Sequence, residues 1–284
     1  MMASDIPDAL RLCAAANWNQ TEADWQWLLA FEPDGCFAAE FDGALAGTAT
    51  TTRYEPARGP GSFAWIGMML VNPAQRRSGI GSALLSKCIE FLEDAGVETI
   101  KLDATALGKK VYDTFGFRDE YLLERWEGPA QALAADCARG CEIEMIREMQ
   151  IDELSAFDAP IFGAQRRRVL QAWRAAWPEC AIAARINGAL AGYALARRGA
   201  RFQQIGPVIG RSPEICEALL RESLARFPSA NVVVDLAAQN SWTKQIAERC
   251  GLKCQRPLIR MARGPNASPG QMEHVLAICC PELG

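Results

Sequence analysis

The sequence has a single histidine, His274, and none of its 11 cysteines forms a Cys-x-x-Cys pair. The two wider pairs, Cys137–Cys141 and Cys250–Cys254, lie far apart in the chain. With so little histidine and such spacing, we expect no zinc site and predict no metal. The odd number of cysteines, scattered among apolar neighbours, indicates buried free thiols in a reducing compartment rather than a disulfide framework.

The chain also lacks a surplus of positive charge and a long apolar run. Lys and Arg number 30 against 34 Asp and Glu, a net charge of -4, whereas binding to a phosphate backbone needs a basic surplus. The longest uncharged stretch, 59–75, contains Pro60 and Pro73 and cannot span a bilayer. No basic region precedes an apolar one at the start, so no secretory signal is expected. We expect a cytoplasmic protein with no nucleic-acid or membrane partner; these features do not indicate the oligomeric state.

What the sequence does contain is an internal repeat. With 284 residues, 50% of them hydrophobic, the chain is long enough for about two domains. The run GALAG at 43–47 recurs at 188–192. In each copy Asp42 or Asn187 precedes the glycine and forms with it the two-residue type I′ turn of a β-hairpin. A further strand, an amphipathic helix, a buried strand, a helix and a last strand then follow in each half.

This order of elements predicts an α/β fold of two domains. Each domain is expected to have a mixed, mostly antiparallel sheet flanked by helices on both faces. We place the domains at 1–130 and 140–284, because Ala and Gly dominate between Pro129 and Gly140. A short helix at 131–138 remains an alternative there.

The most informative segment is 71–81, VNPAQRRSGIG, which joins a predicted strand to a predicted helix. Gly79 and Gly81 allow the main chain to approach a ligand closely, and the helix N-terminus adds about half a positive charge. Arg76 and Arg77 add charged donors. The segment is not a Walker loop, because no Gly-Lys-Ser/Thr follows, and it lacks the third glycine of a dinucleotide fingerprint. It predicts a phosphate site with a spacing of its own.

The pattern Val-x-Pro-x-x-Arg-x-x-Gly-x-Gly, followed by Tyr112 four residues before Gly116, resembles the GNAT family of acyl-CoA N-acetyltransferases. The resemblance covers residues 1–128 closely and the second half only through topology and the repeat. It implies acetyl-CoA as the acyl donor, with the diphosphate on the main chain of 77–82. The residues that it implies for acetyl-CoA binding are Met69, Leu70, Val71, Arg76, Arg77, Ser78, Gly79, Ile80, Gly81, Ser82, Thr105 and Tyr112. Thr105 departs from the family, which often has Asn there.

The resemblance makes Tyr112 the general acid that protonates the departing thiolate. A phenol with a reference pKa of about 10 is still protonated at neutral pH. A main-chain N–H at Met69 or Leu70 is the expected donor to the thioester carbonyl oxygen.

Carboxylates near the expected cleft are candidates for the general base. We single out Asp103 and Glu40 as catalytic candidates, with Asp42 and Glu120 as weaker ones. Asp103 has a counterpart in Asp235 of the second half, which suits a structural carboxylate equally well.

The acceptor site is expected near a tryptophan-rich helix whose first turn is capped by Thr21. In the family this region borders the acceptor, so Trp18 and Asn19 are candidate acceptor-binding residues, and Trp65 is a third candidate. Trp25 and Trp27 lie two residues apart and cannot share one helix face, so at least one belongs to the core.

The second half lacks both motifs. The spacing of the glycine loop is lost at 206–214, and Ala247 stands where the tyrosine would be. We interpret it as a degenerate, noncatalytic copy that completes the acceptor pocket, stabilises the first domain or binds a regulator. Binding of acyl-CoA in a changed manner is the alternative.

The predicted function is therefore acetyl transfer from acetyl-CoA to a primary amine, by direct attack in a ternary complex. A small-molecule acceptor is expected, and a protein lysine or N-terminus is an alternative. A noncatalytic acyl-CoA sensor or scaffold is the alternative from another class. The identity of the amine and the acyl length are not determined by the sequence.

Overall fold

The computed structural model describes residues 1–57, 63–132 and 140–284. The elements of the first half are α1 (Ile6–Ala15), α2 (Glu22–Phe31), β1 (Cys36–Phe41), β2 (Ala44–Pro56), β3 (Phe63–Val71), α3 (Ile80–Asp94), β4 (Thr99–Ala104), α4 (Ala106–Thr114) and β5 (Arg118–Pro129). Those of the second half are β6 (Cys141–Met145), α5 (Ile151–Phe162), β7 (Ala164–Gln165), α6 (Arg167–Ala176), β8 (Ile182–Ile186), β9 (Ala189–Arg198), β10 (Gln203–Gly210), α7 (Pro213–Ala225), β11 (Asn231–Ala237), α8 (Ser241–Arg249), β12 (Lys253–Arg263) and β13 (Val275–Ala277). Short 3₁₀ turns lie at Ala3–Asp5, Pro33–Gly35, Pro73–Gln75, Glu148–Gln150, Pro178–Cys180 and Met272–His274.

Both predicted hairpins form with the predicted turn. Asp42 and Gly43 have φ of 50° and 75°, and Asn187 and Gly188 have φ of 51° and 79°. Positive φ at both central residues defines the type I′ turn, whose twist suits the flanking strands. The repeat therefore marks the same structural unit in each half, β1–β2 and β8–β9.

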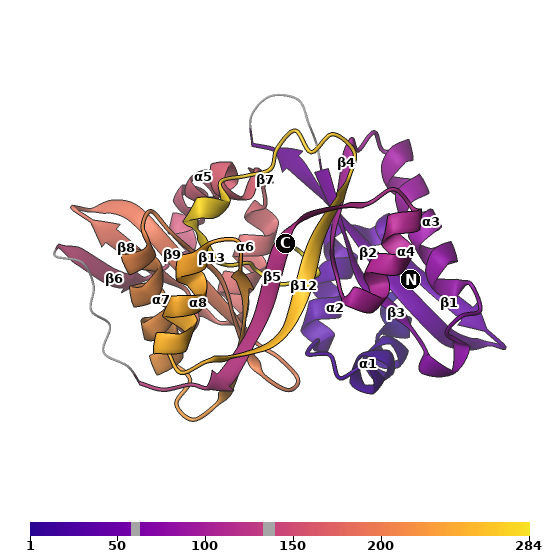
Figure 1. Cartoon of the computed structure of the whole chain (residues 1–284), viewed down its shortest axis with the longest axis horizontal. Helices are drawn as coiled ribbons and strands as arrows, with labels where there is room; N and C mark the ends of the chain where they lie inside the picture. Colours follow the sequence, from indigo (N-terminus) through magenta and orange to yellow (C-terminus); the bar gives the residue numbers. More distant parts are fainter. Residues whose placement is uncertain (58–62, 133–139) are drawn as a thin grey trace.

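The two halves exchange strands β5 and β12. β12, from the second half, lies between β4 and β5 of the first half and is antiparallel to both. The other edge of β5 pairs with β11 of the second half. The strand order is therefore β1-β2-β3-β4-β12-β5-β11-β13-β10-β9-β8-β6, one sheet running through both halves. In Figure 1, β5 and β12 cross the middle of the molecule between the two groups of helices.

The predicted α/β class and the mixed, mostly antiparallel sheet are confirmed. The strand exchange was not predicted. The division at 1–130 and 140–284 stays a prediction, because the sheet runs through both parts and most of the join, 133–139, lies outside the described residues. Cys137 and residues 133–138 of the alternative helix fall in the same gap, and 131 and 132 are not helical.

The largest hydrophobic core is shared by both halves. It contains Trp25 of α2 and Tyr54 of β2 from the first half, and Trp173 of α6 and Tyr193 of β9 from the second. Two further cores lie under α3 and under α7. Because burial of apolar side chains is the main favourable term in folding, the shared core holds the halves in a fixed arrangement.

The cysteines follow the expectation with one exception. Nine of those in the described part of the chain are free thiols, eight of them buried. Cys141 is disulfide-bonded, so the expectation of free thiols is wrong at this position. Within the described ranges, no group of metal-ligating side chains comes together. No helix in those ranges is long and apolar enough to cross a membrane.

Candidate active site

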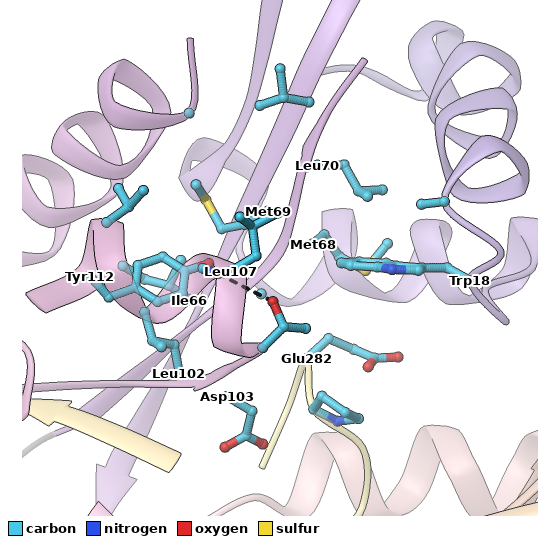
Figure 2. A pocket seen from close by; sticks show the side chains of 18 of the residues that line it. Trp18, Ile66, Met68, Met69, Leu70, Leu102, Asp103, Leu107, Tyr112 and Glu282 are labelled. Atoms are coloured by element: carbon cyan, nitrogen blue, oxygen red, sulfur yellow. Dashed lines mark hydrogen bonds between the residues drawn. The ribbon is translucent and has the colours of Figure 1, made fainter. Parts of the chain in front are cut away.

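A cavity of about 620 Å³ opens where β3 and β4 separate. The two strands pair in parallel only from Phe63 to Trp65 on β3 and then diverge, which leaves the edge of β3 at 69–71 facing the cavity. In Figure 2, Tyr112 and Trp18 lie on opposite sides of this space, with Met69 between them and Asp103 and Glu282 below. The predicted donor residues that line it are Met69, Leu70, Val71, Arg76, Arg77, Gly79, Gly81, Ser82, Thr105 and Tyr112.

The glycine-containing loop occupies one end of the cavity. Arg77 and Gly79 have positive φ, 68° and 89°, and Gly79 is the N-cap of α3. A Cβ at Gly79 would meet nothing within 4 Å, so the conformation rather than crowding favours glycine there. The side chains of Arg76 and Arg77 are exposed, and within the described residues neither forms an ion pair. The first-turn N–H groups of α3 have no acceptor in their own helix.

A β-bulge bends β3 at the centre of the cavity. Thr50 pairs with Gly67 and Thr48 with Leu70, so β3 has one residue more than β2 over this stretch. Met68 adopts a φ of 51°, and its carbonyl oxygen accepts a hydrogen bond from the Thr48 hydroxyl at 2.9 Å. A bulge leaves an N–H outside the regular ladder. The bend therefore interrupts the regular β2–β3 ladder next to Met69.

Tyr112 projects from α4 into the same space. Thr105 caps this helix by accepting a hydrogen bond from the Gly108 N–H at 3.2 Å. A Cβ at Gly108 would lie 2.9 Å from the Tyr112 ring, so glycine at this position makes room for the ring. Burial raises the pKa of Tyr112 to about 12. The phenol is therefore a proton donor that remains protonated over the usual working range of pH.

Asp103 lines the cavity but is engaged by an arginine of the second half. Arg260 of β12 donates from Nε and Nη2 to the two carboxylate oxygens at 2.8 and 2.9 Å. Burial raises the pKa of Asp103 to about 6, although Arg260 opposes this shift. The Arg260 guanidinium also lies 4.4 Å from the ring centre of Trp65. This geometry is that of a buried structural ion pair.

Comparison with known proteins adds to this geometry. Residues 5–117 match the sequence profile described as the acetyltransferase (GNAT) family, and residues 154–277 match a profile described as an acetyltransferase (GNAT) domain. The chain belongs to the GNAT family of acetyltransferases. It is therefore an acyltransferase enzyme with two GNAT domains in tandem.

Individual relatives agree with this assignment. The chain is 26% identical over 230 residues to the uncharacterized N-acetyltransferase YitH of Bacillus subtilis, covering 79% of this chain and 78% of that protein. A mycothiol acetyltransferase of Acidimicrobium ferrooxidans is 31% identical over 111 residues, 35% of this chain and 36% of the relative. A crystal structure of a candidate acetyltransferase from Pyrococcus horikoshii superposes with a TM-score of 0.81 at 23% identity, covering 100% and 94% of the two chains.

Four of the residues predicted for the GNAT site do not line the cavity. Glu40 is exposed near the end of β1, beside its bulge. The Ser78 hydroxyl donates to the Gln75 carbonyl at 2.5 Å, and Ile80 packs against Gly47 of β2. Trp65 is buried, and its indole N–H donates to the Pro281 carbonyl at 2.9 Å. The weaker base candidates are also elsewhere: Asp42 lies in the β1–β2 turn and Glu120 pairs with Lys101.

Asn19 lines the cavity, but the second half uses both ends of its amide. Its Nδ2 donates to the Phe202 carbonyl at 3.0 Å, and its Oδ1 accepts from the N–H groups of Arg201 and Phe202 at 2.9 Å each. These bonds fix the β9–β10 turn against the first half. Trp18 remains the aromatic wall expected there, Trp25 is the core residue of its helix, and Thr21 caps α2 as predicted.

The sequence did not predict most of the residues that line the other end of the cavity, away from the glycine-containing loop. They come mainly from the exchanged strands and the C-terminal segment: Gln20, Arg125, Gln204, Arg256, Leu258, Pro281 and Glu282. No motif marks them, because strands distant in the sequence bring them together.

The corresponding groove of the second GNAT domain is filled by the chain itself. β10 and β11 pair in parallel from Gln203 to Ile205 and then separate, as β3 and β4 do. β13 enters this gap, where it pairs with Val208 and Ile209 of β10 and with Leu236 of β11. Val208 and Ile209 match Met69 and Leu70 in the repeat. The edge that faces the cavity in the first domain is thus occupied by protein in the second.

Proposed function

We propose that the chain transfers an acetyl group from acetyl-CoA to a primary amine of a small-molecule acceptor, by direct attack in a ternary complex. One observation carries this proposal. A single cavity joins the phosphate loop to a separate polar end and passes the β3 bulge and Tyr112 on the way. Both substrates can therefore be bound at once, with the reacting atoms beside the bulge.

The donor would bind at the loop and along β3. The first-turn amides of α3 and the cations Arg76 and Arg77 suit a diphosphate. The free edge of β3 at 69–71 offers main-chain groups to the amides of pantetheine, as an added strand would use them. In the second domain β13 makes this kind of pairing, which supports a single donor site per chain.

The reacting centre would use the bulge and Tyr112. The neutral acceptor nitrogen forms a bond to the thioester carbon and gives up one proton to solvent, and the C–S bond breaks. A main-chain N–H at Met69 or Leu70 stabilises the oxyanion, and the Tyr112 phenol gives its proton to the departing sulfur. Asp103 would act as a structural partner of Arg260 rather than as the base, because both its oxygens already accept from that guanidinium.

A small molecule suits the acceptor end better than a protein. The end of the cavity away from the glycine-containing loop is lined by residues of both halves. They include Asn19, which is bonded to the β9–β10 turn, and Pro281 and Glu282 of the C-terminal segment. A relative of this chain is named for the acetylation of mycothiol. A protein lysine or N-terminus remains the other acceptor that the test below can detect.

The test is acetyl-CoA binding by calorimetry, followed by coenzyme A release with a panel of amines at pH 8. We expect one acetyl-CoA per chain and amine-dependent thiol release. Two molecules per chain would support a second donor site, and binding without release on any amine or peptide would support a sensor. Absence of binding would refute the proposal.

A double variant tests whether the two arginines of the loop bind acetyl-CoA. Arg76→Gln together with Arg77→Gln should weaken acetyl-CoA binding by about tenfold, because charge-assisted contacts to phosphate are lost. Arg211→Gln is the matched control, since Arg211 lies just before α7, the counterpart of α3 in the second domain. An unchanged affinity in the double variant would exclude these arginines from the donor site.

A further inference from the structure

The polar end of the cavity contains a cation, Arg256, that has no hydrogen-bond or ion-pair partner at its Nε among the described residues. Arg256 of β12 lines the cavity and is half-buried. Its Nε is buried and has no hydrogen-bond partner, and within the described residues the side chain forms no ion pair. Burial and the nearby Arg125 guanidinium both lower the pKa of Arg256. An arginine held in this way is costly unless an anion arrives to pair with it.

The neighbouring carboxylate, Asp235, is already engaged by other groups. Arg125 faces the same cavity and takes both oxygens of Asp235, from Nε at 2.8 Å and from Nη2 at 2.7 Å. Gln204 Nε2 donates to the same carboxylate at 3.1 Å. The guanidinium groups of Arg125 and Arg256 thus have one carboxylate near them, and its oxygens accept hydrogen bonds from Arg125 and Gln204. This part of the cavity is positive.

A second part of the same end has the opposite character. Glu282 lines the cavity and accepts a hydrogen bond from Gln20 at 2.9 Å. Its cationic partner, Arg197, lies 3.4 Å away and makes its shorter contact, 2.8 Å, with Asp24. Arg197 and Gln204 are hydrogen-bonded to each other, so they link this carboxylate to the Arg125–Asp235 pair. Here one arginine, Arg197, pairs with two carboxylates, Asp24 and Glu282. In the positive part, the two arginines Arg125 and Arg256 have only the Asp235 carboxylate near them.

We propose that the acceptor is an amine that also carries a carboxylate, which pairs with Arg256 while the amine faces Glu282. This inference rests on the proposed function, because it names the class of acceptor for the same site. A carboxylate can take two donors of one guanidinium, so it would satisfy the unpaired Nε. An ammonium group near Glu282 gains from that carboxylate, which can also take up a proton before the neutral amine attacks.

The second GNAT domain then has a defined part in the enzyme. Arg256 comes from β12, the strand that it inserts into the first half, and Glu282 from the segment after β13. The main chain at Glu282 passes over Gly67, where a Cβ would lie 2.7 Å from the Glu282 carbonyl oxygen. By filling its own groove, the second domain delivers an acceptor-binding segment to the first.

The experiment compares amines that differ only in the carboxylate. Four pairs are assayed for coenzyme A release at saturating acetyl-CoA: L-phenylalanine and its amide, L-lysine and its amide, 4-aminobutyrate and its amide, and glycylglycine and its amide. We expect at least one carboxylate member to exceed its amide by about tenfold or more in kcat/KM. Arg256→Gln should abolish this preference through KM of the acceptor, and Arg256→Lys should keep part of it.

Lys253→Gln is the matched control. It removes a positive charge from the same strand at an exposed position outside the cavity, so the preference should persist. The inference is overturned if the amides react as well as the acids, if no carboxylate-bearing amine exceeds the acceptor-free rate, or if Arg256→Gln keeps the preference. Acetyl-CoA binding is measured separately on each variant. Its persistence in those cases would show that the donor site stands while the acceptor class is wrong.

Discussion

At the scale of single residues, the proposed mechanism depends most on the Tyr112 phenol. Tyr112 lies opposite Trp18 across the cavity, and in the described structure its hydroxyl makes no hydrogen bond to another residue. Gly108 gives the ring its space. Burial raises the pKa of Tyr112 to about 12 and so keeps its proton in place.

Tyr112→Phe should lower kcat by about 10²-fold or more, the usual contribution of a general acid. The dissociation constant of acetyl-CoA should stay within about twofold, because no phosphate contact is removed. Since the Tyr112 pKa is near 12, activity of the native enzyme should not fall between pH 7 and 10 through loss of this proton. Steady-state kinetics and calorimetry check both values.

Tyr193→Phe is the control for loss of a buried hydroxyl. Tyr193 lies in β9, donates to Asp158 at 2.5 Å and is not among the residues that line the cavity. It should lose stability but keep kcat. Equal turnover of Tyr112→Phe and the native enzyme would remove Tyr112 from the mechanism.

At the scale of elements, the C-terminal segment connects the two GNAT domains through a pair of equivalent glycines. Gly206 of β10 would place a Cβ 2.1 Å from the Ile278 carbonyl oxygen, and Gly67 of β3 would place one 2.7 Å from that of Glu282. The segment is held further by the Tyr54 hydroxyl, which donates to the Leu283 carbonyl at 2.7 Å. Each bulged strand therefore has the same chain segment packed against its glycine.

Gly67→Ala should displace Glu282 and so raise KM for the acceptor more than it changes acetyl-CoA affinity. Overpacking of this kind typically costs about 1–3 kcal/mol of stability. Gly43→Asn is the control, because a Cβ there meets nothing within 4 Å and Asn tolerates a positive φ. Thermal unfolding and acceptor kinetics provide the measurements. A Gly67→Ala enzyme that matches the native one in both would contradict a role for this contact.

At the scale of the whole molecule, the exchange of β5 and β12 makes the two domains one folding unit. Met261 of β12 belongs to the second half in sequence but is buried in the core under α3 of the first. Removing a side chain from one domain should therefore destabilise the other. Two domains joined only by a linker would not behave in this way.

Met261→Ala should lower the free energy of unfolding by about 2–5 kcal/mol, the usual cost of truncating a buried side chain. In urea, hydrogen exchange of β2 and of β9 should report the same midpoint, and the variant should shift both together. Met145→Ala, on the exposed face of β6, should change stability by less than about 0.5 kcal/mol. Separate midpoints for β2 and β9 would contradict a single unit.

Interactions between sequence neighbours were enough to predict much of the structure at the end of the cavity near the glycine-containing loop. The strand at 63–71, the Asp42–Gly43 turn and the Thr21 cap depend on neighbours in sequence, and the structure has all three. The phosphate-loop residues and Tyr112 are likewise spaced by one strand or one helix, so their order along the chain predicts that they share a cavity.

The polar end of the cavity could not be predicted in this way, because contacts between residues distant in the sequence form it. Arg256 and Glu282 reach the cavity only because β12 crosses into the first half and β13 fills the groove of the second. Glu40 and Trp65 lie outside the cavity lining, Glu40 exposed near the end of β1 and Trp65 bonded to the C-terminal segment, so their expected roles stay predictions. The sequence by itself determined the repeated unit and the loop that leads into α3, because turns, caps and periodicity act over a few residues. Only the tertiary structure decided which charges line the polar end of the cavity, because strand pairing and burial join segments more than 100 residues apart.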